Sequence, residues 1–73
     1  MIIGYLTQRI SYNDSGNDEY IGYAEPGKKE TENKWQIRKM IYDDSKRFIS
    51  IFYAEGSYLF DYKWSERTTY NYK

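Results

Sequence analysis

Short runs of alternating apolar and polar residues, separated by clusters of turn-forming residues, predict that this chain is built of β-strands. Residues 2–10 alternate loosely, and a strand there would place Ile3, Tyr5 and Thr7 on one face. The segment Asn13–Glu19 (NDSGNDE) follows, and its composition is typical of a solvent-exposed loop. The N-terminal part therefore predicts one strand and one loop.

The next two segments predict a short strand and a longer loop. Residues 20–24 (YIGYA) form the strand, which ends at Pro26 and Gly27. These two residues fit the central positions of a type II turn, where proline fixes φ and glycine tolerates a positive φ. Residues 28–34 contain no apolar residue, so we expect a solvated loop.

The segment 35–42 (WQIRKMIY) predicts a strand that contributes to the core. Trp35, Ile37 and Ile41 fall on one face when side chains alternate. A helix would also group Ile37 with Met40 and Ile41, but an apolar residue one turn further on is missing. We therefore favour the strand.

The C-terminal half predicts three further strands. A turn over residues 43–47 leads into residues 48–54 (FISIFYA), which are β-branched or aromatic and apolar on both faces except at Ser50. A tight hairpin at residues 55–56 then leads to a strand over 58–62, and residues 67–72 form a short terminal strand. Together these elements predict an all-β fold, a small antiparallel barrel or sandwich of about five to six short strands.

Composition limits the chemistry of this single domain of 73 residues. Cysteine and histidine are both absent, which excludes disulfides and removes the commonest zinc ligands and general bases. We therefore expect no enzymatic activity, no catalytic residues, no metal and no cofactor. Eleven basic and eleven acidic residues cancel, so nucleic acid is not an expected partner. No apolar run is long enough to span a membrane, and we expect a soluble, non-secreted chain.

One stretch matches the skeleton of a phosphate-binding loop, G-x-x-x-x-G-K, from Gly22 to Lys28. The motif needs Ser or Thr next for magnesium, and here Lys29 follows. No amphipathic helix follows either, so we interpret Pro26 and Gly27 as an ordinary turn.

Two acidic groups invite a functional interpretation that their spacing does not support. Asp14, Asp18 and Glu19 lack the D-x-[DN]-x-[DN]-G spacing of a calcium loop, so a solvated turn is favoured. Asp43 and Asp44 are neighbours whose side chains would diverge in a strand, whereas acid–base pairs need convergent carboxylates. We expect them to begin a turn.

Aromatic residues interleaved with Lys and Arg offer another class of function. They could form a stacking platform for single-stranded nucleic acid or for sugar rings, built from Trp35, Arg38, Lys39, Tyr42, Arg47, Phe48 and Phe52. The alternative is that the aromatics form the core and the charges are solvated. Zero net charge favours this alternative over nucleic acid, while a glycan stays open.

The ten tyrosines and two tryptophans exceed what one small core can bury. Some must be half-buried on a solvated face or hidden at an interface, where Tyr and Trp are enriched. We favour subunit contacts. The residues predicted at the interface lie near the chain ends and are Tyr5, Tyr12, Tyr70 and Tyr72. Those predicted in the core are Trp35, Ile37, Ile51, Phe60 and Trp64.

Five sequence elements occur in a recognisable order. They are YIGYAEPG (20–27), a variable loop, WQIRKMIYD (35–43), AEG (54–56) and FDYKWSER (60–67), before a terminal Tyr-containing segment. In this order the chain resembles a small β-domain that recurs in virion structural proteins of tailed bacteriophages. The resemblance covers residues 20–72 as the core, with residues 1–19 as an added strand and loop.

The resemblance implies a non-enzymatic virion component present in many copies. It would belong to the tail, neck or fibre apparatus or decorate the capsid, after assembly in the host cytoplasm. The expected partners are further copies of the chain and other virion proteins, with no membrane. A glycan- or single-stranded nucleic-acid-binding β-barrel is the alternative function, and the positions that match the family pattern all look structural.

Overall fold

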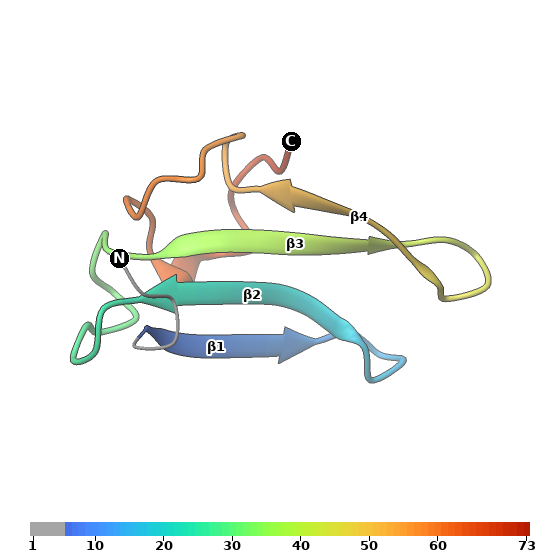
Figure 1. Cartoon of the computed structure of the whole chain (residues 1–73), viewed down its shortest axis with the longest axis horizontal. Coiled ribbons are helices and arrows are strands. Elements are labelled where there is room, and N and C mark those ends of the chain that lie inside the picture. The colour runs from blue at the N-terminus through green and yellow to red at the C-terminus, as the bar shows by residue number, and fades with distance from the viewer. Residues whose placement is uncertain (1–5) are drawn as a thin grey trace.

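The computed structural model describes residues 6–73, which form one four-stranded antiparallel sheet in the order β1-β2-β3-β4 (Figure 1). The strands are β1 (Thr7–Tyr12), β2 (Asp18–Ala24), β3 (Gln36–Tyr42) and β4 (Phe48–Tyr53). The predicted all-β class and the meander are confirmed. Closure into a barrel or sandwich is not, because β1 and β4 are the two edges of an open sheet.

Two hairpins are held by a side chain at the first position of each turn. Asn13 Oδ1 accepts from the backbone N–H groups of Ser15 and Asn17, at 2.9 and 3.1 Å. Asp43 Oδ1 accepts in the same way from Ser45 and Arg47, at 2.9 Å each. Such contacts explain why turn formers cluster at these points. Asp14, Asp43 and Asp44 lie at turns as predicted, whereas Asp18 and Glu19 are the first residues of β2, so the prediction is wrong for them.

The connection from β2 to β3 is longer and starts at the expected turn. The Lys28 N–H donates to the Glu25 carbonyl oxygen at 3.4 Å, and Gly27 has a φ of 89°. A positive φ at the second central residue is what a type II turn requires. The loop that follows is exposed, yet the Glu30 carbonyl accepts from the Ser65 N–H at 3.0 Å. The loop is therefore tied to the C-terminal segment.

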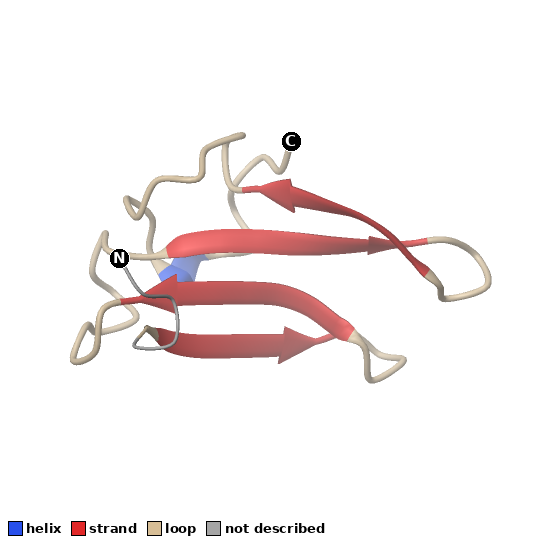
Figure 2. Ribbon diagram, in the orientation of Figure 1, coloured by secondary structure: helices blue, strands red, loops and turns tan. Residues whose placement is uncertain are grey.

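The two strands predicted after β4 do not form. Residues 54–73 run irregularly, with isolated bridges between Trp35 and Tyr62 and between Ala54 and Tyr72, and one 3-10 turn at Trp64–Glu66 (Figure 2). Glu55 and Gly56 both have positive φ, and the Ser57 N–H donates to the Ala54 carbonyl oxygen at 3.0 Å, so a tight turn does follow β4, but no strand follows that turn. The chain then crosses behind the sheet, where alternating aromatic residues pack as a coil instead of pairing as strands.

The core lies between the sheet and this C-terminal segment. Its buried residues are Tyr20, Ala24, Trp35, Ile37, Ala54 and Trp64, with Tyr62, Tyr70 and Tyr72 packed against them. The prediction of Trp35, Ile37 and Trp64 as core residues is confirmed.

The prediction of the core is wrong for two residues, Ile51 and Phe60. Ile51 is 40% exposed, because it pairs with Met40 and so lies on the face opposite Ile37. The strand is apolar on both faces, so its sequence gave no means of choosing between them. Phe60 is only half-buried, because it belongs to the irregular segment and not to a strand of the sheet.

Gly22 allows the two tryptophans to meet over the centre of the sheet. A Cβ at this position would lie 2.5 Å from Trp64 Cε3 and 3.1 Å from Trp35 Cε3. The indole rings are 6.1 Å apart between centroids, with planes tilted by 36°. The Trp35 Nε1–H donates to the Lys29 carbonyl oxygen at 2.9 Å, so burial leaves that polar atom satisfied.

We predict that Gly22→Ala lowers the free energy of unfolding by about 2 kcal/mol, because the added methyl group overpacks against Trp64. Urea unfolding followed by tryptophan fluorescence would measure it. The sign of the change in unfolding free energy tests this contact. Glycine in a strand is usually unfavourable, so without the contact to Trp64 alanine would stabilise the protein.

Candidate functional site

The register of the four strands sorts their side chains onto two faces with different surroundings. The covered face carries the core and lies against the C-terminal segment. The other side, which we call the open face, carries Gln8, Ile10, Tyr12, Ile21, Tyr23, Gln36, Arg38, Met40, Tyr42, Ile51 and Tyr53. The 3-10 turn at Trp64–Glu66 lies behind the sheet, away from the open face (Figure 2), and Lys73 exchanges backbone hydrogen bonds with Tyr53 beside β4.

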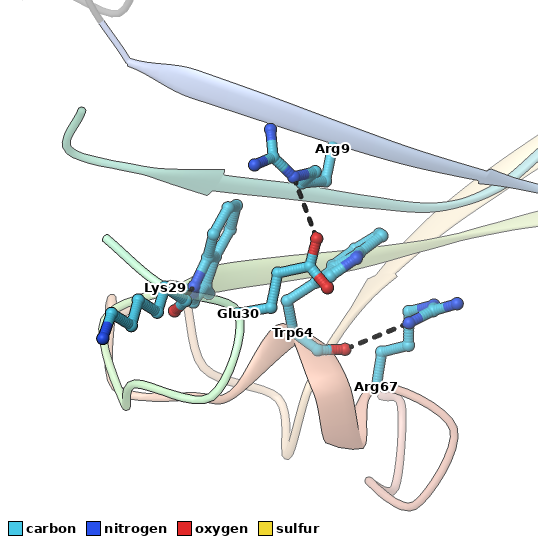
Figure 3. Close-up of polar contacts among 6 residues, drawn as sticks. Arg9, Lys29, Glu30, Trp64 and Arg67 are labelled. Atoms are coloured by element: carbon cyan, nitrogen blue, oxygen red, sulfur yellow. Dashed lines mark hydrogen bonds and ion pairs between the residues drawn. The ribbon is translucent and has the colours of Figure 1, made fainter. Parts of the chain in front are cut away.

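The cations of the covered face are all engaged by aromatic rings. The Arg9 guanidinium lies 5.7 Å from the Trp35 ring centroid, and its Nε is 3.1 Å from a Glu30 carboxylate oxygen (Figure 3). The Arg67 guanidinium lies 4.6 Å from the Trp64 ring, and its Nη1 donates to the Trp64 carbonyl at 3.3 Å. These contacts bind the β2–β3 loop and the C-terminal segment to the sheet, so their role is structural.

Lys39 completes this set on the covered face. Its ammonium group lies 5.6 Å from the Tyr20 ring and 5.8 Å from the Tyr72 ring. Those two rings pack on each other at 5.4 Å. The positive charge is therefore placed over aromatic faces and joins β3 to the end of the chain.

The basic residue of the open face is Arg38, and its charge is held by two tyrosines; Glu19 alternates onto the same face as Ile21 and Tyr23. The Arg38 guanidinium lies 4.9 Å from the Tyr23 ring and 5.5 Å from the Tyr53 ring. Its Nε donates to Gln36 Oε1 at 2.9 Å. This bond draws the charged group towards the start of β3, away from the middle of the face.

Four aliphatic side chains cross the middle of the open face. Ile10 pairs with Ile21, and Met40 pairs with Ile51, so all four strands contribute an aliphatic side chain, in two rows. Arg38 stands beside Ile21 in the first row. Met40 is buried, whereas Ile10 is 37% exposed at one edge of the sheet. A sheet face that stays in water normally alternates to polar side chains, so the exposed aliphatic residues favour a contact surface.

The predicted interface tyrosines have different environments. Tyr5 lies outside the described residues. Tyr12 is 60% exposed at the end of β1, and its interface role stays a prediction. Tyr70 and Tyr72 instead pack on their own chain: the Lys63 N–H donates to the Tyr70 hydroxyl at 2.8 Å, and the Tyr72 hydroxyl donates to the Arg67 carbonyl at 2.5 Å. These two side chains are half-buried and pack on the rings of Tyr62 and Tyr20, so they have a structural role within the chain; their role at an interface stays a prediction.

The predicted stacking platform does not assemble on one surface. Trp35 and Lys39 belong to the covered face, whereas Arg38 and Tyr42 belong to the open face. The sequence missed Tyr23 and Tyr53, although their positions around Arg38 follow from alternation once the strand register is known.

A pocket of about 230 Å³ is lined by Glu25, Lys28, Lys34 and Phe60. Lys28 comes from the phosphate-loop-like stretch, but Gly22 of that stretch lies inside β2. Among residues 6–73, no three His, Cys, Asp or Glu side chains gather closely enough to hold a metal ion. Within the same residues, no helix has the length and apolarity needed to cross a membrane.

Comparison with family models, curated proteins and solved structures finds no match for this chain. The open face therefore has to be interpreted from its own residues.

Burial raises the pKa of Tyr72 above the usual 10.0, and the neighbouring Tyr20 and Tyr70 raise it further. Tyrosines of the unfolded chain begin to ionise at about pH 10. Because the pKa of Tyr72 is higher in the folded state, its contribution to the free energy of unfolding is fully present below this pH and falls as the pH rises beyond it.

We predict that Tyr72→Phe costs about 1 kcal/mol at pH 7, because the bond to the Arg67 carbonyl is lost. The variant should also lose less stability than the parent above about pH 10, because it has one ionisable group fewer to hold neutral. Tyr12→Phe at the exposed position is the control. Chemical denaturation at pH 7 and above about pH 10 measures the free energy of unfolding of all three proteins. An equal loss of this free energy with pH in all three would contradict the prediction.

Proposed function

We propose that this chain is a non-enzymatic structural subunit that binds neighbouring proteins through the open face of its sheet. One observation carries the proposal: the open face exposes the aliphatic side chains of Ile10 and Ile51 on its two edge strands, and its arginine is held between two tyrosines. Protein interfaces have this composition at their centres, with Tyr, Met and Arg enriched and Lys, Glu and Asp depleted.

We further propose that the assembly is the particle of a tailed bacteriophage, in its tail, neck or fibre apparatus or on its capsid. The support is the ordered set of motifs over residues 20–72. In the structure these motifs supply the framework: Gly22, Trp35 and Trp64 meet in the core, and Gly56 turns the chain away from β4.

We predict that the chain sediments with intact particles in density gradients from cells that express it naturally. Quantitative mass spectrometry should find it in a fixed, multiple ratio to the major particle protein, because a structural subunit occupies symmetric sites. An abundant soluble protein of the same cells is the control. Recovery of the chain only in low-mass fractions would contradict membership of a particle.

Binding of a glycan or single-stranded nucleic acid remains the second proposal. The observation in its favour is the Tyr23–Arg38–Tyr53 group, which places two aromatic rings and a cation on an accessible face. One side of each ring is already occupied by the guanidinium, which leaves less surface for stacking. Glycan-array binding, or oligonucleotide binding that weakens steeply with salt and is lost in Arg38→Gln, would favour it.

A further inference from the structure

We infer that Arg38 is the anchor for a carboxylate, so that the protein that covers the open face places an Asp or Glu side chain on the Arg38 guanidinium. The inference rests on the proposed function, because it names the chemistry that the same contact surface requires of its partner.

The Arg38 side chain is held in one orientation by its neighbours. Its Nε donates to Gln36 Oε1 at 2.9 Å. Gln36 is itself buried, and its Nε2 donates to the Tyr58 carbonyl oxygen at 2.8 Å. The guanidinium carbon also lies 4.9 Å from the Tyr23 ring centroid and 5.5 Å from that of Tyr53. A buried amide bonded at both ends and two aromatic rings therefore orient this cation before any partner binds.

The two Nη groups of Arg38 are free to donate. Within residues 6–73, the bond from Nε to Gln36 is the one hydrogen bond that this guanidinium makes. Its Nη atoms are also accessible, because the one buried side-chain nitrogen or oxygen without a partner in this part of the chain is Nε of Arg67. The pair of Nη groups presents parallel N–H donors, a geometry that matches the two oxygens of a carboxylate.

No carboxylate of the described chain forms an ion pair with Arg38. The ion pairs among residues 6–73 lie elsewhere and join Arg9 to Glu30, Arg47 to Asp43, and Lys63 to Glu66. Glu19 shares the open face, but it lies two residues along β2 from Ile21, which is the residue that pairs with Arg38. The counter-charge of Arg38 can therefore come from a partner.

Covering the open face makes this counter-charge necessary. Ile10, Ile21, Arg38 and Tyr53 form one row across the four strands, so a partner that contacts the exposed Ile10 also removes water from the guanidinium. A buried charge without a partner is strongly destabilising, whereas a close, hydrogen-bonded charge pair is tolerated or favourable. The partner that fits carries an Asp or Glu opposite Arg38 and apolar side chains opposite Ile10 and Ile51.

The isolated position of Arg38 favours a carboxylate over the phosphates of a nucleic acid. The other basic residues of the four strands are Arg9 and Lys39, and rings of the covered face engage both. Nucleic-acid binding relies on several cations that neutralise successive phosphates. One arginine between two tyrosines is instead typical of the residues that dominate binding energy at protein interfaces.

The test uses small antibody domains from a display library, selected on the full chain. Domains are kept when they bind the chain but not its Ile51→Glu variant, because that change places a charge on the open face. We expect the kept domains to contact the chain through an Asp or Glu, and its replacement by Asn or Gln should weaken binding about 30-fold or more. Arg38→Gln should weaken binding by a similar factor. The two changes together should cost little more than either alone, because they remove the same pair.

Arg47→Gln is the matched control, since it makes the same substitution at an exposed arginine of the turn between β3 and β4. We expect it to change binding by no more than about twofold. Arg38→Lys keeps the charge but loses the paired donors, so it should restore only part of the affinity. Far-UV circular dichroism would verify that all variants fold.

Domains that cover the open face without an acidic contact, or that bind Arg38→Gln as well as the parent, would overturn the inference. Failure to select any domain that distinguishes Ile51→Glu would overturn it too. A single-stranded thymidine oligonucleotide that binds the parent but not Arg38→Gln would assign the arginine to phosphate instead.

The two proposals fail separately. Open-face binding that does not depend on an acidic residue would remove the carboxylate anchor and keep the contact surface. Acid-dependent binding by a chain that never sediments with particles would keep the anchor and remove the particle.

Discussion

The contact of Trp64 with Gly22 is the constraint on which the rest of this structure depends. An indole ring can reach the backbone of β2 only because residue 22 has no Cβ. That approach brings Trp64 against Trp35 and fixes the course of the irregular C-terminal segment across the covered face. Four strands alone would leave both faces of the sheet bare, and this contact decides which one becomes the core.

Aromatic–cation contacts take the place that disulfides or a metal occupy in many small domains. Arg9, Lys39 and Arg67 each lie over a ring of the covered side, and together they join β1, β3 and the C-terminal segment. Each contact contributes about 0.5–2 kcal/mol, depending on how far it is desolvated. The high aromatic content therefore has a structural use inside the chain, apart from any interface.

The same residue types serve a different purpose on the open face. There Arg38 is held between Tyr23 and Tyr53, and the exposed aliphatic side chains of Ile10 and Ile51 lie on the edge strands. The covered face holds its cations in a network that joins loop and C-terminal segment to the sheet, whereas the open face leaves aliphatic side chains in contact with water. This exposed aliphatic surface is the physical basis of the proposed assembly role.

The sequence by itself determined the four strands, the hairpin turns at Asn13 and Asp43, the turn at Pro26–Gly27 and the core positions of Trp35, Ile37 and Trp64. These follow from local patterns: alternation, turn chemistry and the bulk of tryptophan. Tertiary structure decided that residues 54–73 form a largely irregular segment, because the packing of its rings against the sheet outweighs strand pairing. It also decided that Ile51 faces outward and Tyr72 inward, since a strand that is apolar on both sides acquires an inner face only when another segment covers it.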